Sequence, residues 1–420
     1  MSGSASVTPT PAPPSTGMPT VTMIGGGQLA RMTHQSAIAL GQCLRVLAAS
    51  PSEPAAQVSA DIVLGSHDDL DDLLAAADGA VTVTFDHEGV PLELLTAMEQ
   101  RGVVVRPPST ALQYAQDKLL MRHRLAELGL PVPEFVDLSG DVAAAREALI
   151  AFGREQDWQI VLKAVRGGYD GRGVWLIDGD EQQALAVFDE QRRGDTVLMA
   201  EQKVPMAREL SALIARSPHG QGAAWPVVES IQRNGQCAVV LAPAPDLDEQ
   251  TAQRAQQMAL RLADELGVVG NMAMELFETA DGGLMVNELA MRPHNTGHWT
   301  MDGAVTSQFE QHLRAVLDYP LGDTTARTGA AVMANILGAP QAPAMSMDER
   351  LHHLMARMPE AKVHLYGKSE RPDRKVGHIN IIGLPGQSMD HVRERAERAA
   401  HWMSHGVWTD GWDPHEKETN

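Results

Sequence analysis

The sequence has few cysteines, few aromatic side chains and a deficit of basic residues, and these shortages exclude several classes of protein. Only two cysteines, Cys43 and Cys237, occur in 420 residues, so the chain can form at most one disulfide and cannot build a zinc site from cysteines alone. We interpret both as free thiols of a reducing compartment. With 34 Lys and Arg against 54 Asp and Glu, the net charge is −20, which disfavours nucleic acid as a partner because its phosphates would be repelled.

Membrane-spanning and targeting segments are also lacking. The uncharged residues 328–347 are long enough to cross a bilayer, but they contain Pro340 and Pro343 and are better explained as a buried strand followed by a loop. Residues 1–19 are rich in Ser, Thr and Pro without a basic start or an apolar segment, which predicts a disordered lead-in rather than a signal peptide. We therefore expect a cytoplasmic protein with no membrane partner.

The remaining sequence, 44% hydrophobic, is long enough for about three domains. Apolar runs alternate with polar or helical stretches such as 28–40, which predicts a parallel α/β domain over 20–117; these runs are 21–24, 43–48, 62–64, 80–85 and 103–106. Antiparallel strand pairs after a helix at 118–128 predict a second domain over 118–325, with a lid subdomain at about 160–205. A small C-terminal domain at 326–410, with strands at 330–336 and 379–382 and a helix at 390–403, precedes a polar tail at 411–420. The fold class is mixed, α/β and α+β.

Two glycine-rich turns follow predicted strands. Residues 25–30 match G-x-G-x-x-A, the form of a dinucleotide-binding turn, but the second strand ends without the acidic residue that holds a ribose. We favour a tight strand-to-helix turn that could hold any polar ligand. The second turn, residues 166–173, carries four glycines between two strands and follows Lys163. It resembles a lid over nucleotide phosphates, although a long hairpin whose tip tolerates glycine is the alternative.

A hairpin around Asp281-Gly282 provides the strongest evidence for a site. A turn centred there places Glu275 directly opposite Glu288, and like charges in this position destabilise a sheet unless a cation lies between them. Two carboxylates bridged by Mg²⁺, with Asn287 as a further oxygen ligand, meet this requirement. The alternative is a carboxylate with a raised pKa or a buried Arg partner.

Two clusters of hydrogen-bond donors follow this hairpin. Residues 292–298 include Arg292, His294 and Asn295, and Arg292 is suited to stabilising negative charge on a transferring phosphoryl group or acyl phosphate. Lys368, Arg371, Arg374 and Lys375 form a basic loop that predicts an anion site in an otherwise acidic chain. A solvated loop is the alternative for each cluster.

These motifs, in this order, resemble the ATP-grasp superfamily and, more narrowly, the PurK-type N5-carboxyaminoimidazole ribonucleotide synthases of purine biosynthesis. The resemblance covers nearly all of residues 20–405 and is most specific over 287–298. It implies an N-terminal pre-ATP-grasp domain, a two-part ATP-grasp domain and a small C-terminal domain. The chain departs from the family pattern at Ala30, Gly89, Gln232 and Met291.

The family activity implied is an ATP-dependent carbon–nitrogen ligation. ATP would phosphorylate bicarbonate to carboxyphosphate, and 5-aminoimidazole ribonucleotide would capture the carboxyl group, with Mg²⁺ and without biotin. The resemblance also implies a homodimer. The alternatives are another ATP-grasp ligase that uses formate or an amino acid, an ATP sensor that has lost turnover, and an NAD-dependent oxidoreductase.

The resemblance assigns roles to residues of this sequence. Those on the ATP side are Arg106, Lys118 and Lys163 at the phosphates, Gly168, Tyr169, Asp170, Gly171, Arg172, Gly173 and Val174 in the covering loop, Glu201, Gln202, Lys203 and Val204 at adenine, Glu209 at the ribose, and Gln232, Asn287 and Glu288. Those on the aminoimidazole side are Gln28, Leu29, Glu88, Tyr169 and Asp170, with Lys368 and Arg374 on the 5′-phosphate. Glu275 and Glu288 would hold the metal, and Arg292, His294 and Asn295 would lie near the carboxyphosphate.

Overall fold

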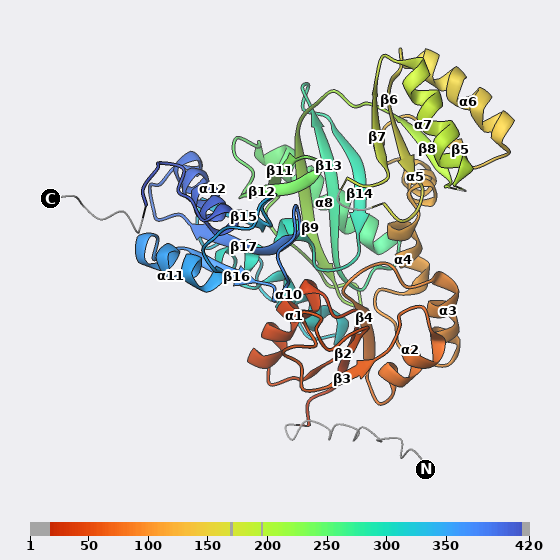
Figure 1. Cartoon of the computed structure of the whole chain (residues 1–420). Helices are drawn as coiled ribbons and strands as arrows, with labels where there is room; N and C mark the ends of the chain where they lie inside the picture. Colours follow the sequence, from red (N-terminus) through yellow and green to blue (C-terminus); the bar gives the residue numbers. More distant parts are fainter. Residues whose placement is uncertain (1–16, 169–170, 195, 414–420) are drawn as a thin grey trace, which may run out of the picture. The chain divides into compact units, whose positions relative to one another are not determined.

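The computed structural model describes residues 17–168, 171–194 and 196–413, and the chain divides into two compact units, 1–106 and 107–420 (Figure 1). Each unit is described by itself. None of the helices in these described ranges is both long enough and apolar enough to cross a membrane. Cys43 and Cys237 are both free thiols, as the sequence predicted.

Unit 1 is a parallel α/β domain, which confirms the predicted class. Its four strands follow the order β3-β2-β1-β4, and every neighbouring pair is parallel. The elements are β1 (Val21–Ile24), α1 (Gln28–Ala39), β2 (Leu44–Ala48), β3 (Ile62–Leu64), α2 (Leu70–Ala77), β4 (Thr82–Phe85) and α3 (Leu92–Gln100). The strand predicted at 103–106 is wrong, because only a single parallel bridge joins Val105 to Val83. Pro107 and Pro108 follow directly, and proline lacks the N–H group that a longer ladder requires.

The glycine turn of unit 1 is closed by the side chain of the residue that follows β4. The Asp86 carboxylate accepts hydrogen bonds from the backbone N–H groups of Gly27 (2.7 Å) and Ala30 (2.8 Å) at the start of α1. A Cβ atom at Gly27 would collide with this carboxylate. Asp86 therefore lies at the helix terminus where a dinucleotide pyrophosphate would bind, and the tight-turn interpretation accounts for the glycines.

Unit 2 begins with two helices and a four-stranded antiparallel sheet in the order β5-β8-β6-β7. The elements are α4 (Ser109–Gln116), α5 (Lys118–Glu127), β5 (Phe135–Leu138), α6 (Val142–Glu155), β6 (Gln159–Ala164), β7 (Val174–Asp178), α7 (Glu181–Arg193) and β8 (Leu198–Gln202). The helices α6 and α7 bury Leu149, Phe152 and Phe188 against Ile160 and Leu162 of β6. The four-stranded sheet and its two helices correspond to the lid subdomain predicted at about 160–205. They begin earlier than predicted, at Phe135 of β5.

The rest of unit 2 is built on one nine-stranded sheet. The strands follow the order β14-β13-β9-β11-β12-β15-β17-β16, with β10 paired to β9, and all neighbours are antiparallel. The strands are β9 (Met206–Arg216), β10 (Gly222–Ala224), β11 (Val228–Arg233), β12 (Gln236–Ala242), β13 (Gly270–Thr279), β14 (Leu284–Ala290), β15 (Ala331–Leu337), β16 (Lys362–Leu365) and β17 (Lys375–Ile382). The remaining helices are α8 (Glu249–Glu265), the 3-10 turn η1 (Asn295–Gly297), α9 (Thr300–Gly303), α10 (Gln308–Val316), α11 (Met347–Arg357) and α12 (Met389–His405).

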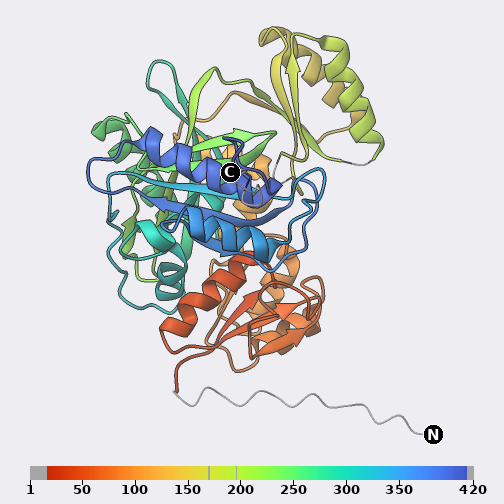
Figure 2. The same cartoon turned by 60° about the vertical axis from the view of Figure 1, so that its left-hand side comes forward.

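The C-terminal segment does not form a sheet of its own. Its strand β15 pairs with β12, so residues 326–410 extend the same sheet that carries β13 and β14. Helix α12 packs on β15 and β17, and Figure 2 shows it running beside these strands. Ordered contacts reach at least to Trp412, since the Arg357 guanidinium lies 4.7 Å from its ring centroid. Residues 414–420 of the predicted tail lie outside the described residues.

Candidate active site

The site is centred on the β13–β14 hairpin, where the predicted pairing of two carboxylates is confirmed. Glu275 lies directly opposite Glu288, and the register then shifts by one residue, so that Leu276 pairs with Val286. Asn287 is thus an extra residue, a β-bulge that the sequence analysis did not predict. A bulge sets two consecutive residues against one partner, which brings the oxygens of Asn287 and Glu288 together opposite Glu275.

Two lysines approach this bulge from other elements of unit 2. Lys118, the first residue of α5, places its Nζ 2.8 Å from Glu288 Oε1, and Lys163 of β6 places its Nζ 3.1 Å from Asn287 Oδ1. Helix α5 is fixed at this end because the Asp117 side chain accepts a hydrogen bond from Leu120 N–H. The two predicted phosphate-binding lysines and the predicted metal-side residues are therefore adjacent.

A buried carboxylate holds Lys163 in place. Glu201 of β8 lies 2.6 Å from Lys163 Nζ and accepts a 2.5 Å hydrogen bond from Arg122 Nε of α5. Arg122 also donates to the backbone carbonyl of Asn287 at 2.6 Å. Burial alone would raise the pKa of Glu201, but the charges and hydrogen bonds of Arg122 and Lys163 outweigh it and lower this pKa to about 2. Burial lowers the pKa of Lys163.

Glu275 has the opposite electrostatic environment. Burial, then the nearby carboxylates of Glu288 and Glu209, raise the pKa of Glu275 to about 8. The side chains of Glu275 and Glu288 nevertheless keep 25% and 42% of their surface exposed, so a cation can reach both. Within the described ranges no cluster of three or more His, Cys, Asp and Glu side chains suits a metal ion, so any cation here would have to take further oxygens from a ligand or water.

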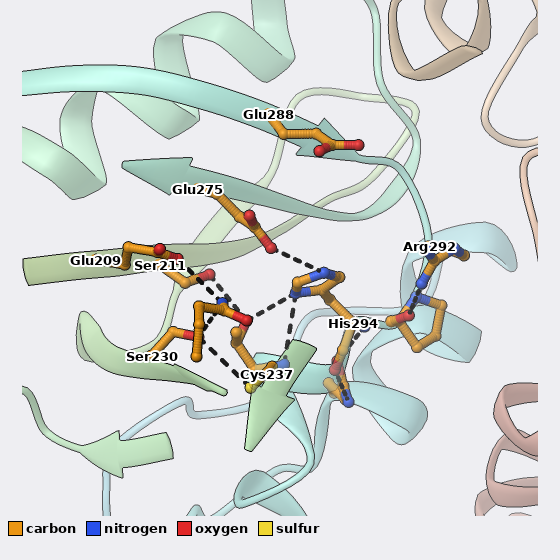
Figure 3. A network of polar contacts seen from close by, with 12 residues as sticks. Glu209, Ser211, Ser230, Cys237, Glu275, Glu288, Arg292 and His294 are labelled. Carbon is orange, nitrogen blue, oxygen red and sulfur yellow. Dashed lines mark hydrogen bonds and ion pairs between the residues drawn. The ribbon is translucent and has the colours of Figure 1, made fainter. Parts of the chain in front are cut away.

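His294 follows β14 and points toward Glu275 (Figure 3). Its Nε2 lies 3.3 Å from Glu275 Oε1. Burial, together with the positive charges of Arg292 and Lys375, lowers the pKa of His294 to about 3. Because the histidine is neutral at neutral pH, this contact is not an ion pair. The backbone of His294 is held by Gln308, whose side-chain amide bonds both its N–H and its carbonyl group at 2.8 Å.

The predicted ribose residue, Glu209, lies on β9 in the same network. Gln232 donates from Nε2 to Glu209 Oε2 and to Ser230 Oγ, both at 3.0 Å. Burial raises the pKa of Glu209, and the Gln232 hydrogen bond counteracts this rise. Cys237 lies at the edge of the network, with Sγ 3.5 Å from Ser230 Oγ (Figure 3).

The glycine-rich loop connects β6 to β7 and lies over Lys118. A Cβ atom at Gly168 would lie 3.9 Å from Lys118 Cε and too close to the Arg172 carbonyl oxygen. Gly171 has φ +77°, and a Cβ there would lie 3.0 Å from the carbonyl oxygen of Gly235 in the β11–β12 turn. The close approach to the Arg172 carbonyl at Gly168, and the positive φ and the close approach to Gly235 at Gly171, account for glycine at these two positions. Tyr169 and Asp170 lie outside the described residues.

The other predicted contacts are distributed more widely. The backbone N–H groups of Gln202 and Lys203 bond to the carbonyls of Glu134 and Gln159, and Val204 follows the end of β8. Arg374 Nη1 donates to Ser369 Oγ at 2.9 Å within the basic loop, next to Lys375. Gln28, Leu29, Glu88 and Arg106 belong to unit 1, at or beyond the carboxyl ends of its strands, and their role in binding stays a prediction.

Several residues of the site were missed from the sequence. Arg122 follows Lys118 by one helical turn, a spacing that places both side chains on one face of α5. This spacing could have revealed it. Thr296 lies within the motif that follows β14, so its position could have drawn attention to it. Nothing in the sequence around Ser211 or Gln308 indicates a role in the site. Lys375 was assigned only to the basic loop, yet its charge acts on both Glu275 and His294.

Comparisons with known proteins agree with this arrangement. Three family models match the chain: a ribonucleotide synthetase preATP-grasp domain at residues 18–116, an ATP-grasp domain at 123–309 and a phosphoribosylaminoimidazole carboxylase C-terminal domain at 331–395. The N5-carboxyaminoimidazole ribonucleotide synthase of Mycobacterium tuberculosis is 60% identical over 406 residues, covering 97% of this chain and 92% of that protein.

Solved structures give the same result. The crystal structure of N5-carboxyaminoimidazole ribonucleotide synthetase from Thermus thermophilus superposes with a TM-score of 0.79 at 35% identity, covering 94% of this chain and 100% of that one. The Aspergillus clavatus N5-carboxyaminoimidazole synthase, solved with ADP and 5-aminoimidazole ribonucleotide, superposes with a TM-score of 0.81 at 27% identity, covering 92% and 98%.

Proposed function

The chain belongs to the N5-carboxyaminoimidazole ribonucleotide synthase family, ATP-dependent ligases of purine biosynthesis, and we propose the following division of labour among its residues. ATP phosphorylates bicarbonate, and the exocyclic amine of 5-aminoimidazole ribonucleotide attacks the resulting carboxyphosphate. The products are N5-carboxyaminoimidazole ribonucleotide, ADP and phosphate. The observation that carries this proposal is the Glu275–Glu288 pair with Lys118 and Lys163 beside it.

The donor set of the bulge fits Mg²⁺. Two facing carboxylates, one with a raised pKa, indicate a like-charge contact that a divalent cation would relieve. Mg²⁺ prefers oxygen ligands and commonly uses one or two carboxylates together with substrate phosphates. Glu275 and Glu288 would hold it, with Asn287 as a neighbouring oxygen. When bound, the ion would neutralise charge on the transferring phosphoryl group.

The cations of the site have separate tasks in this proposal. Lys118 and Lys163 bind the phosphates of ATP. Glu201, which is itself hydrogen-bonded by Arg122, holds Lys163 in place and counteracts the effect of burial on its charge. Glu209 and Gln232 lie on the ribose side, and residues 201–204 contact adenine. The glycine loop covers the phosphates and excludes water, which protects a short-lived acyl phosphate from hydrolysis.

Arg292, His294 and Asn295 act on the carboxyphosphate. The low pKa of His294 leaves its ring neutral, so it serves as a hydrogen-bond donor rather than a charge. Asn295 directly follows His294, and its side chain forms a hydrogen bond with the buried Cys237 thiol. Arg292 contributes the positive charge that stabilises the developing anion. Gln28, Leu29, Glu88, Lys368 and Arg374 contact the aminoimidazole ribonucleotide.

The decisive assay measures ADP release with Mg²⁺, ATP and bicarbonate, with and without 5-aminoimidazole ribonucleotide. We expect strong stimulation by the aminoimidazole substrate, and its loss in Glu288→Ala and Arg292→Ala with unchanged thermal unfolding. Glu147→Ala and Arg193→Ala are matched controls, because both residues are exposed on α6 and α7. A folded, ATP-binding protein without stimulation would overturn the substrate assignment.

The family also implies a cytoplasmic homodimer that needs no nucleic-acid or membrane partner. Size-exclusion chromatography with light scattering measures the molar mass and therefore gives the oligomeric state. A monomeric mass at working concentration would contradict that part of the proposal and leave the chemistry unaffected.

A further inference from the structure

The hydroxyl groups of Thr296 and Ser211 connect His294 to strand β9 through a series of hydrogen bonds. His294 Nδ1 lies 2.8 Å from Thr296 Oγ1, which in turn lies 2.8 Å from Ser211 Oγ. Ser211 on β9 is the direct cross-strand neighbour of Glu275 on β13. His294 Nε2 faces Glu275. Both ends of this hydrogen-bonded series, His294 and Ser211, therefore lie next to Glu275.

The hydrogen bonds of this series have one consistent direction. The backbone N–H of Thr296, which can only donate, points at His294 Nδ1 from 3.4 Å. Nδ1 is therefore an acceptor, and the Thr296 hydroxyl must donate to it as well. The free lone pairs of Thr296 Oγ1 then accept from the Ser211 hydroxyl. The ring proton is left on Nε2, which directs it toward Glu275 Oε1.

These hydroxyl groups are shielded from bulk solvent. Ser211 is 0% exposed and Thr296 is 2% exposed, so removing the Thr296 hydroxyl leaves His294 Nδ1 with only the 3.4 Å contact of the Thr296 backbone N–H. Removing the Ser211 hydroxyl takes one of the two hydroxyl-network partners from Thr296 Oγ1. Gln308 fixes the backbone of His294 but makes no contact with its Nδ1. The orientation of the ring and the position of its proton thus depend on Thr296 and Ser211.

We propose that Thr296 and Ser211 are positioning residues that hold His294 as the Nε2–H tautomer, with this N–H aimed at the reacting end of the site. The inference deepens the proposed function and rests on the placement of His294 at the carboxyphosphate. A donor aimed in advance acts on developing charge without reorganising during the reaction. The partner of the second ring nitrogen commonly sets which tautomer is present.

The first experiment reads the tautomer itself. Long-range proton–nitrogen NMR on histidine-labelled full-length protein shows which ring nitrogen carries the proton, and the His294 signals are those that vanish in His294→Gln. We expect Nε2–H in the wild type and a smaller share of this tautomer in Thr296→Val, because only the long 3.4 Å contact of the backbone N–H then remains at Nδ1. A wild-type ring protonated on Nδ1 would overturn the proposal, whatever the activity of the variants.

The second experiment reads the consequence for turnover. We expect Thr296→Val to lower kcat by about tenfold to a hundredfold, to leave the KM values for ATP and the aminoimidazole substrate unchanged, and to be rescued by Thr296→Ser. Ser211→Ala should have a smaller effect in the same direction, because Thr296 can still donate to Nδ1. Thr22→Val is the matched control, since this buried threonine donates only to the Ala76 carbonyl in unit 1.

The possible failures are distinguishable. An unchanged kcat in Thr296→Val, or no rescue by Thr296→Ser, would refute the positioning role. Should Thr296→Val not fold, the wild-type tautomer and Ser211→Ala decide the question. Full activity in His294→Gln would remove the histidine from the proposed chemistry, while the tautomer measurement would still test the series of hydrogen bonds.

Discussion

Glu201 and Glu275 lie in the same unit of the protein, yet their surroundings shift their pKa values in opposite directions. Glu201 is enclosed by Arg122 and Lys163, and these cations keep its pKa at about 2. Glu275 faces two further carboxylates and a neutral histidine, and its pKa rises to about 8. The comparison shows that burial alone does not decide the charge of a carboxylate, because the nearest partners determine the sign of the shift.

The largest expected effect comes from removing the cation that pairs with Glu201. Arg122→Met should lower the free energy of unfolding by about 3 to 5 kcal/mol, since it leaves a buried carboxylate with only one partner. Urea unfolding followed by circular dichroism measures this loss. Arg193→Met, at an exposed position of α7, is the control. A loss no larger than that of the control would show that Arg122 and Glu201 are not coupled.

The next largest effect is the loss of stability in Glu201→Gln, which should depend on pH. Glu201→Gln should lower stability at pH 7 by about 1.5 to 3 kcal/mol, the cost of losing hydrogen bonds to charged groups. The folded pKa lies below the ordinary value of 4.5, so this contribution is complete above pH 4.5 and is lost as the pH falls toward about 2. The wild type and the variant should therefore converge in acid. A gap that stays constant with pH would contradict the ionised state of Glu201.

Glu275→Gln is the counterpart of that variant and should behave differently. The raised pKa of Glu275 favours its neutral form in the metal-free protein, so replacing it with an amide should change stability by less than about 1 kcal/mol. Turnover with Mg²⁺ and ATP should still fall at least about a hundredfold, because a charged oxygen ligand is lost. Thermal unfolding and the ADP-release assay check the two halves. Equal destabilisation in Glu201→Gln and Glu275→Gln would contradict the opposite pKa shifts of the two carboxylates.

The smallest expected effect concerns Glu209, whose surroundings are intermediate between those of Glu201 and Glu275, because burial raises its pKa and one hydrogen bond lowers it. Gln232→Leu removes the hydrogen bond that counteracts the raised pKa of Glu209. Loss of one such bond corresponds to a rise of at most about tenfold in the KM for ATP, with kcat retained. Initial rates at varied ATP measure it. A larger fall in kcat than in affinity would move Gln232 from the nucleotide side to the chemistry.

Local signals predicted the fold of unit 1 and the core of the site. The predicted turn centre pairs Glu275 with Glu288, but next to the turn the strands pair one residue away from that register, with Leu276 opposite Val286. The bulge at Asn287 restores the predicted pairing of the two carboxylates. The bulge at Asn287 was not predictable, since it leaves no turn residue or break in the pattern. Its effect is nevertheless large, because it sets three oxygen-bearing side chains together.

Contacts between distant segments account for what the sequence could not reveal. Arg122 meets Glu201 from 79 positions away and the Asn287 carbonyl from 165. Thr296 meets Ser211 across 85 positions. Such pairs depend on how the sheets and α5 are packed, and neither periodicity nor composition encodes that packing. The same holds for the joining of the C-terminal strands to the large sheet.

The pairing of β12 with β15 also has a consequence for synthesis on the ribosome. The partner strand is translated about 90 residues after β12, which at roughly 5 to 20 residues per second takes several seconds. During this time the apolar edge of β12 lacks its neighbour and can pair with other nascent chains. The central part of the catalytic sheet therefore stays open to aggregation until synthesis has passed β15.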